Sequence, residues 1–145
     1  MKKLNWGILG TGWIATEMGD ALNRVNGEIY AVCDVTLEAA QKYADQYGVQ
    51  KAYGNADEMI NDPNVDIVYI ATPHNLHYQF LVKALRAGKH VFCEKAITVN
   101  SQQLEEAVAI AKEKESICYV IFLTASKIHL YHFDFTNHTT LNNFL

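Results

Sequence analysis

Two patterns of hydrophobic and polar positions alternate along this chain: short apolar runs, and longer segments with apolar residues at helical spacing. The runs predict strands at Leu4–Leu9, Glu28–Cys33, Ala52–Tyr53, Val65–Ala71, His90–Cys93 and Ile117–Leu123. The periodic segments predict helices at Ile14–Val25, Thr36–Tyr47, Asn55–Asn61, Leu76–Ala87 and Ser101–Lys114. Strands that alternate with helices through short connections are typical of a doubly wound α/β fold with a parallel sheet.

The pattern changes near the end of the chain. Only Lys127 and Asp134 are charged among the last 30 residues, where histidine, asparagine and aromatic residues become frequent. We therefore predict one α/β domain over residues 1–123, followed by an atypical and loosely attached tail over residues 124–145. The tail is too short to build a second hydrophobic core.

Composition and charge narrow the possible partners. The 145 residues carry a net charge of −4, with 50% hydrophobic and 19% charged residues, which is ordinary for a globular domain. This balance gives no basic surface for nucleic acid and no polybasic membrane patch. No apolar run approaches the roughly 18 residues of a membrane helix, and Met1–Lys3 leads directly into a strand pattern with no room for a signal peptide. We expect neither nucleic acid nor a membrane as partner.

The three cysteines, Cys33, Cys93 and Cys118, lie far apart in apolar strand patterns. Their odd number and their spacing fit neither a disulfide framework nor a zinc site, so we expect no metal. Buried, reduced thiols favour a cytoplasmic protein.

The first predicted strand ends in a glycine-rich turn, Gly10-Thr-Gly12, and Ala15 supplies the third small residue of a G-x-G-x-x-G/A pattern. In a Rossmann fold, the first glycine makes the tight turn and the second lets the backbone approach a pyrophosphate at a helix N-terminus. A plain strand-to-helix turn is the alternative. The predicted cofactor-binding residues of this turn are Gly10, Thr11, Gly12, Trp13 and Ile14.

Asp34 supports the dinucleotide hypothesis, because it ends the second predicted strand 22 positions after Gly12. A carboxylate there can accept hydrogen bonds from both ribose hydroxyls of NAD and repel the 2′-phosphate of NADP. The chain has no basic residue after Asp34 until Lys42, so we expect NAD in preference to NADP. In the alternative interpretation, Asp34 only caps the helix that follows it.

A second group of polar residues follows two later strands. In a parallel sheet, residues just beyond the carboxyl ends of the strands line the ligand crevice. This rule places Thr72, Pro73 and His74 on the same edge as the glycine turn, together with Glu94 and Lys95. A lysine near a cofactor can transfer a proton, whereas a solvated Glu-Lys ion pair is an equally good interpretation of the residues alone.

Four separated blocks, GILGTGWIA, AVCD, ATPHNLH and ALRAGKHVFCEK, resemble the N-terminal half of the Gfo/Idh/MocA oxidoreductases over roughly residues 4–117. The chain is most similar to the dihydrodiol and D-xylose dehydrogenase branch of that family. The resemblance implies an NAD(P)-dependent dehydrogenase of sugars and related polyols, with Lys95 as the catalytic lysine. It also implies that the loop from Thr72 through His74 to His77 contacts the nicotinamide half of the cofactor.

Two departures from the family pattern matter. The proline that follows the catalytic lysine is replaced by Ala96. Alanine disfavours a cis peptide bond by about 2.5–4 kcal/mol, which leaves Lys95 less firmly placed.

The tail has no counterpart of the family's substrate domain. In the family, that domain supplies a second catalytic group, and members usually pair through it as homo-oligomers. We give His129, His132 and His138 of the tail little weight as substitutes, and we expect His90 to be structural.

The sequence therefore predicts the nucleotide-binding half of a dehydrogenase that transfers a hydride between a nicotinamide and a hydroxyl-bearing carbon of a sugar or polyol. The alternative is a dinucleotide-binding module or fragment without turnover.

Overall fold

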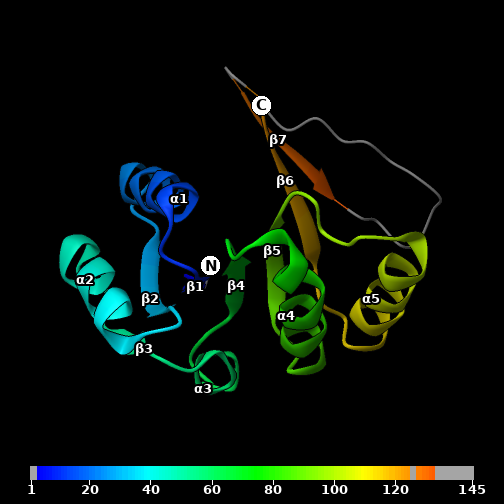
Figure 1. Cartoon of the computed structure of the whole chain (residues 1–145), viewed down its shortest axis with the longest axis horizontal. Helices are drawn as coiled ribbons and strands as arrows, with labels where there is room; N and C mark the ends of the chain where they lie inside the picture. Colours follow the sequence, from blue (N-terminus) through cyan, green and yellow to red (C-terminus); the bar gives the residue numbers. More distant parts are fainter. Residues whose placement is uncertain (1–2, 125–126, 133–145) are drawn as a thin grey trace. The chain divides into compact units, whose positions relative to one another are not determined.

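The computed structural model describes residues 3–124 and 127–132, with side chains described for residues 3–120. The chain divides into two compact units, Met1–Thr72 and Pro73–Leu145. In each unit, helices alternate with parallel strands, as the hydrophobic pattern predicts (Figure 1).

The first unit contains a parallel sheet of four strands in the order β3-β2-β1-β4. Its strands are β1 (Asn5–Leu9), β2 (Glu28–Cys33), β3 (Lys51–Tyr53) and β4 (Ile67–Ile70). Its helices are α1 (Trp13–Arg24), α2 (Leu37–Tyr47) and α3 (Ala56–Ile60). Because β1 lies between β2 and β4, the turn that follows β1 has a strand end on either side.

The register of these strands decides which residues meet at the carboxyl edge of the sheet. Leu9, the last residue of β1, lies opposite Cys33 of β2 and Ile70 of β4. The three strands therefore end at the same level, and the residues that follow them emerge side by side.

The core of the first unit consists of the apolar side chains of the central strands. Ile8, Val32 and Val68 are completely buried, and all four residues of β4 are buried. A central strand covered on both faces needs a continuous apolar run, which is the pattern at this point of the sequence.

Local signals explain where α2 begins and ends. The Thr36 hydroxyl accepts a hydrogen bond from the Ala39 N–H at 3.2 Å and caps the N-terminus. Gly48 ends the helix in the left-handed conformation, with φ +67°, which glycine adopts without a steric penalty. Both roles were predicted from the sequence.

The second unit consists of α4 (His74–Arg86), β5 (His90–Glu94), α5 (Ser101–Glu113), β6 (Cys118–Thr124) and β7 (Lys127–His132). β5 and β6 pair in parallel. The Tyr78 hydroxyl of α4 donates a 2.5 Å hydrogen bond to Glu106 of α5, which links the two helices. Helix α4 begins two residues before its predicted start at Leu76, because Pro73 serves as its N-cap.

Strand β7 is an element that the sequence pattern did not indicate. It pairs antiparallel with β6, and Thr124 lies opposite Lys127 across the connection. The predicted tail of residues 124–145 thus includes the end of β6 and all of β7. His129 and His132 belong to β7, whereas His138 lies outside the described residues.

Across residues 3–124 and 127–132, every helix is too short or too polar to cross a membrane.

Candidate functional site

The turn after β1 requires glycine at its first position. Gly10 has φ +97°, and its N–H donates a 2.8 Å hydrogen bond to the Cys33 carbonyl at the end of β2. A β-carbon on Gly10 would lie 2.8 Å from the Ala71 carbonyl oxygen and 3.3 Å from the Thr72 nitrogen. Both the conformation and the space therefore exclude a side chain, and Thr72 lies beside the turn.

Gly12 lies in a different environment from Gly10. Its backbone is extended, with φ −69° and ψ −179°, and a β-carbon placed on it would meet no atom of the described residues within 4 Å beyond its chain neighbours. Gly12 is the N-cap of α1, which has no side-chain cap and no acidic residue in its first turn. Free space in front of a helix N-terminus without a carboxylate is a suitable place for an anion.

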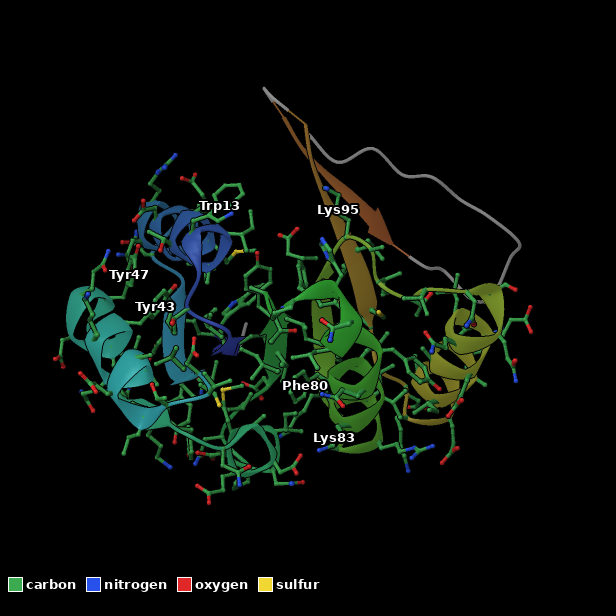
Figure 2. The ribbon with its side chains drawn as sticks, in the orientation of Figure 1. Trp13, Tyr43, Tyr47, Phe80, Lys83 and Lys95 are labelled. Atoms are coloured by element: carbon green, nitrogen blue, oxygen red, sulfur yellow. The ribbon has the colours of Figure 1, made fainter. Side chains whose placement is uncertain are left out.

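Trp13, the first residue of α1, borders this open space. Its side chain is 76% exposed, and Figure 2 shows it projecting from the start of the helix. Ile14 beside it is only half-buried. A large apolar side chain next to an anion site offers a flat surface to the organic part of a nucleotide.

Ala15 is completely buried against α2. Its carbonyl accepts a 2.7 Å hydrogen bond from the Tyr43 hydroxyl, and burial raises the pKa of that hydroxyl. The backbone of α1 at Ala15 is thus tied to α2.

Asp34 follows β2 and contacts the glycine turn directly. Its Oδ2 accepts hydrogen bonds from the Thr11 N–H at 2.8 Å and from the Thr11 hydroxyl at 2.5 Å. Its Oδ1 accepts from the Val35 N–H at 2.6 Å. The interpretation of Asp34 as the cap of α2 is wrong, because Thr36 caps that helix.

Cys33 precedes Asp34 and is buried. Burial, together with the charge of Asp34, raises the pKa of the Cys33 thiol to about 11. Cys93 and Cys118 are also buried and free, as expected, and burial raises the pKa of both thiols. Protonated, enclosed thiols are poor nucleophiles and poor metal ligands.

The residues around Lys95 form a second cluster, within the unit Pro73–Leu145. Glu94 ends β5 and is 7% exposed, whereas Lys95 is exposed on the turn that follows (Figure 2). The different burial of the two side chains argues against the solvated Glu-Lys ion pair. The Lys95–Ala96 peptide bond is cis, although no proline is present.

His77 connects α4 to this turn. Its imidazole is completely buried, and Nδ1 lies 2.9 Å from the Ala96 carbonyl oxygen. Since a carbonyl only accepts, Nδ1 carries a proton and donates it to this hydrogen bond. The exposed His74 ring meets the His77 ring edge to face, with centroids 5.3 Å apart.

Among the described residues, no group of three or more His, Cys, Asp or Glu side chains is placed to hold a metal ion.

Residues 4–122 match the family described as "Oxidoreductase family, NAD-binding Rossmann fold". The chain belongs to the Gfo/Idh/MocA oxidoreductase family. The match runs through both compact units, and it confirms the predicted doubly wound α/β fold.

The chain is similar to trans-1,2-dihydrobenzene-1,2-diol dehydrogenase of Mus musculus, with 37% identity over 114 residues. That match covers 77% of this chain and 34% of the mouse protein. D-xylose 1-dehydrogenase (NADP(+)) of Hypocrea jecorina is 38% identical over 125 residues, which cover 77% of this chain and 32% of the fungal enzyme. The chain therefore spans about a third of the length of these curated relatives.

Among solved members, the NAD binding oxidoreductase from Klebsiella pneumoniae superposes with a TM-score of 0.79 at 36% identity. The alignment covers 82% of this chain and 34% of that structure. The relatives' names include both NAD and NADP, so family membership establishes an NAD(P)-binding fold without choosing between the two.

The structure thus brings the predicted site residues together in two groups, one in each unit. The first comprises Gly10, Thr11, Gly12, Trp13, Ile14, Asp34 and Thr72, and the second comprises Pro73, His74, His77, Glu94 and Lys95. Two contacts were missed: the tie of the Thr11 hydroxyl to Asp34 and the bond of His77 to Ala96. The only sequence signal for the bond between Thr11 and Asp34 was the hydroxyl residue inside the glycine turn. The bond between His77 and Ala96 had no sequence signal.

Proposed function

We propose that this chain binds a nicotinamide dinucleotide through the glycine turn, as the cofactor-binding part of a dehydrogenase. One observation carries the proposal: β1 and β2 end at the same level, so that the Thr11 turn and Asp34 meet in front of the open N-terminus of α1. The free space at Gly12 fits a pyrophosphate, and the carboxylate of Asp34 fits a ribose hydroxyl.

NAD is the proposed cofactor in preference to NADP. The three donors that contact Asp34 are two backbone N–H groups and one hydroxyl, all of them neutral. Within the part of the chain that the structure describes, no cation pairs with this carboxylate to offset its repulsion of a 2′-phosphate. The NADP dependence in the name of the Hypocrea jecorina relative makes this the part of the proposal most in need of measurement.

The proposed reaction is hydride transfer between the nicotinamide and a carbon that bears a hydroxyl in a sugar-like or polyol substrate. When bound, the cofactor supplies the hydride acceptor or donor. Lys95, exposed on the turn after β5, takes the hydroxyl proton during oxidation and returns it during reduction. The loop from Thr72 to His77 and Glu94 belong to the nicotinamide side in this proposal.

A second candidate is a dinucleotide-binding module without turnover. The contacts around Gly12 and Asp34 bear on cofactor binding alone, which is all that this candidate requires. We also propose a small-molecule substrate for the full protein, and association of its copies into a homo-oligomer. A cytoplasmic location is also proposed, because three buried free thiols suit a reducing compartment.

Calorimetric titration of the full chain with NAD⁺ and with NADP⁺ at one ionic strength tests the binding claim. Saturable binding with a lower dissociation constant for NAD⁺ is expected, and tighter binding of NADP⁺ would overturn the preference. NADH formation across a panel of sugars and polyols then separates the two candidates. Turnover supports the dehydrogenase, and binding without turnover supports the module.

A further inference from the structure

Thr11 makes two hydrogen bonds to Asp34 within the candidate site. One oxygen of the carboxylate, Oδ2, receives both the N–H and the hydroxyl of Thr11, at 2.8 and 2.5 Å. Hydrogen bonds to an ionised acceptor are roughly twice as strong as neutral ones, so this pair of bonds holds the carboxylate firmly.

The backbones on both sides of this contact are fixed independently of it. Gly10 donates its N–H to the Cys33 carbonyl at 2.8 Å, which ties the turn to β2. The Asp34 N–H donates to the Tyr53 carbonyl at 3.2 Å, which ties Asp34 to β3. With both backbones held, the remaining freedom of Asp34 is rotation of its side chain, and the Thr11 hydroxyl opposes that rotation.

Among the described residues, the donors to the Asp34 carboxylate leave one of its acceptor positions open. Three donors occupy three of its roughly four acceptor positions, two of them on Oδ2 and one, from Val35, on Oδ1. The open position is therefore on Oδ1, and the oxygen that Thr11 holds is already saturated.

We infer that Thr11 is a positioning residue for cofactor choice: its hydroxyl fixes the rotamer of Asp34, so that the carboxylate meets the adenosine ribose at the 2′ position. This inference rests on the proposed function. A carboxylate held in place cannot turn away from a 2′-phosphate without breaking its hydrogen bonds to Thr11 and Val35. Without the Thr11 hydroxyl, the carboxylate keeps two of its three donors and rotates more easily, which relieves the repulsion of NADP and weakens the contact to the ribose of NAD.

The test measures the dissociation constants of NAD⁺ and NADP⁺ for the full chain and for three variants, by calorimetry at one ionic strength. Thr11→Val keeps the shape of the side chain and the backbone N–H but removes the hydroxyl. We expect the ratio of the NADP⁺ to the NAD⁺ dissociation constant to fall by about tenfold, the size of one hydrogen bond to a charged group. Thr11→Ser restores the donor and should restore the ratio. Thr11→Ala serves as a second hydroxyl-free variant should valine prevent folding.

A merely structural role for Thr11 would lower the affinity for both cofactors equally and leave the ratio unchanged, which would overturn the inference. A serine variant that behaves like valine would overturn it as well. The wild-type titration distinguishes a separate failure: if neither cofactor binds to wild type, the proposed function itself falls and the inference falls with it.

Discussion

The hydroxyl oxygen of Tyr43 lies 2.6 Å from the position that a β-carbon on Gly19 would occupy. The same β-carbon would lie 2.8 Å from the ring of Tyr47. The side chains of α2 therefore pack directly on Gly19 of α1, and the missing side chain of Gly19 lets Tyr43 reach the Ala15 carbonyl.

This relationship reverses the usual effect of replacing a helical glycine. Alanine is favoured over glycine within a helix by about 1 kcal/mol. Overpacking a close contact costs about 1–3 kcal/mol, and here it also displaces the buried Tyr43 hydroxyl from its acceptor. We therefore expect Gly19→Ala to lower the melting temperature measured by circular dichroism. Asn23→Ala, on an exposed position of the same helix, is the matched control. A Gly19→Ala protein at least as stable as wild type would show that the two helices separate easily.

A buried carboxylate, Asp62, anchors the turn after α3. Its Oδ2 accepts from Lys51 Nζ at 2.8 Å and from the hydroxyls of Tyr53 and Tyr30 at 2.7 and 3.3 Å. Its Oδ1 accepts from the N–H and the side-chain amide of Asn64. Burial by itself raises the pKa of Asp62, but hydrogen bonds from Lys51, Tyr53 and Asn64 outweigh burial and hold the pKa well below its usual range.

The lowered pKa gives the stability a defined pH dependence. A folded-state pKa below the unfolded value, about 3.9, contributes stability that is fully present above that value and is lost as the pH falls below it. Asp62→Asn should reduce the free energy of unfolding by about 1–3 kcal/mol at pH 7, and by less at pH 3.5. Urea unfolding at both pH values measures this difference, with the exposed Asp45→Asn as control. A deficit that stays constant with pH would contradict the assignment of the stability to the ionised carboxylate.

His77 provides a test of how the Lys95 turn is held. Replacing His77 with leucine removes the donor to the Ala96 carbonyl while keeping an apolar side chain in a buried position. We expect faster hydrogen exchange in the peptide that contains Lys95 and Ala96, and a loss of about 1–3 kcal/mol in stability.

His74→Leu is the control for this variant, because His74 lies on the same helix and is exposed. If exchange around Lys95 is the same in the His77 and His74 variants, the hydrogen bond does not position the turn.

Much of the fold follows from local signals in the sequence. The tight turn at Gly10 and the cap at Thr36 were predicted and are confirmed, because each depends on a backbone conformation or a capping hydrogen bond that few residue types allow. Strand β7 was missed. Its segment contains Ile128 and Leu130 at a spacing of two, but this short alternation lies among residues without turn or cap signals.

The hydrogen bonds within the candidate site were harder to predict than the residues that belong to it. Asp34 was recognised from its spacing to Gly12, yet its bond to Thr11 depends on the register of β1 against β2, which no local pattern encodes. The bond from His77 to Ala96 joins residues 19 positions apart in the chain through tertiary packing. Spacing indicates which residues share an edge of the sheet, and only the packed structure decides which of them touch.

The central claim is that a dinucleotide pyrophosphate binds at Gly12. The open space around this residue makes the test direct, since a β-carbon there would meet no described atom within 4 Å beyond its chain neighbours, and the backbone angles suit any residue. The measurement is the NAD⁺ dissociation constant of wild type, Gly12→Ala and Gly12→Val, by calorimetry, on proteins whose circular dichroism confirms folding. We predict a graded loss of affinity, with binding by the valine variant weakened at least about a hundredfold, since its side chain occupies the space of the phosphates. A folded valine variant that binds NAD⁺ as tightly as wild type would contradict the account.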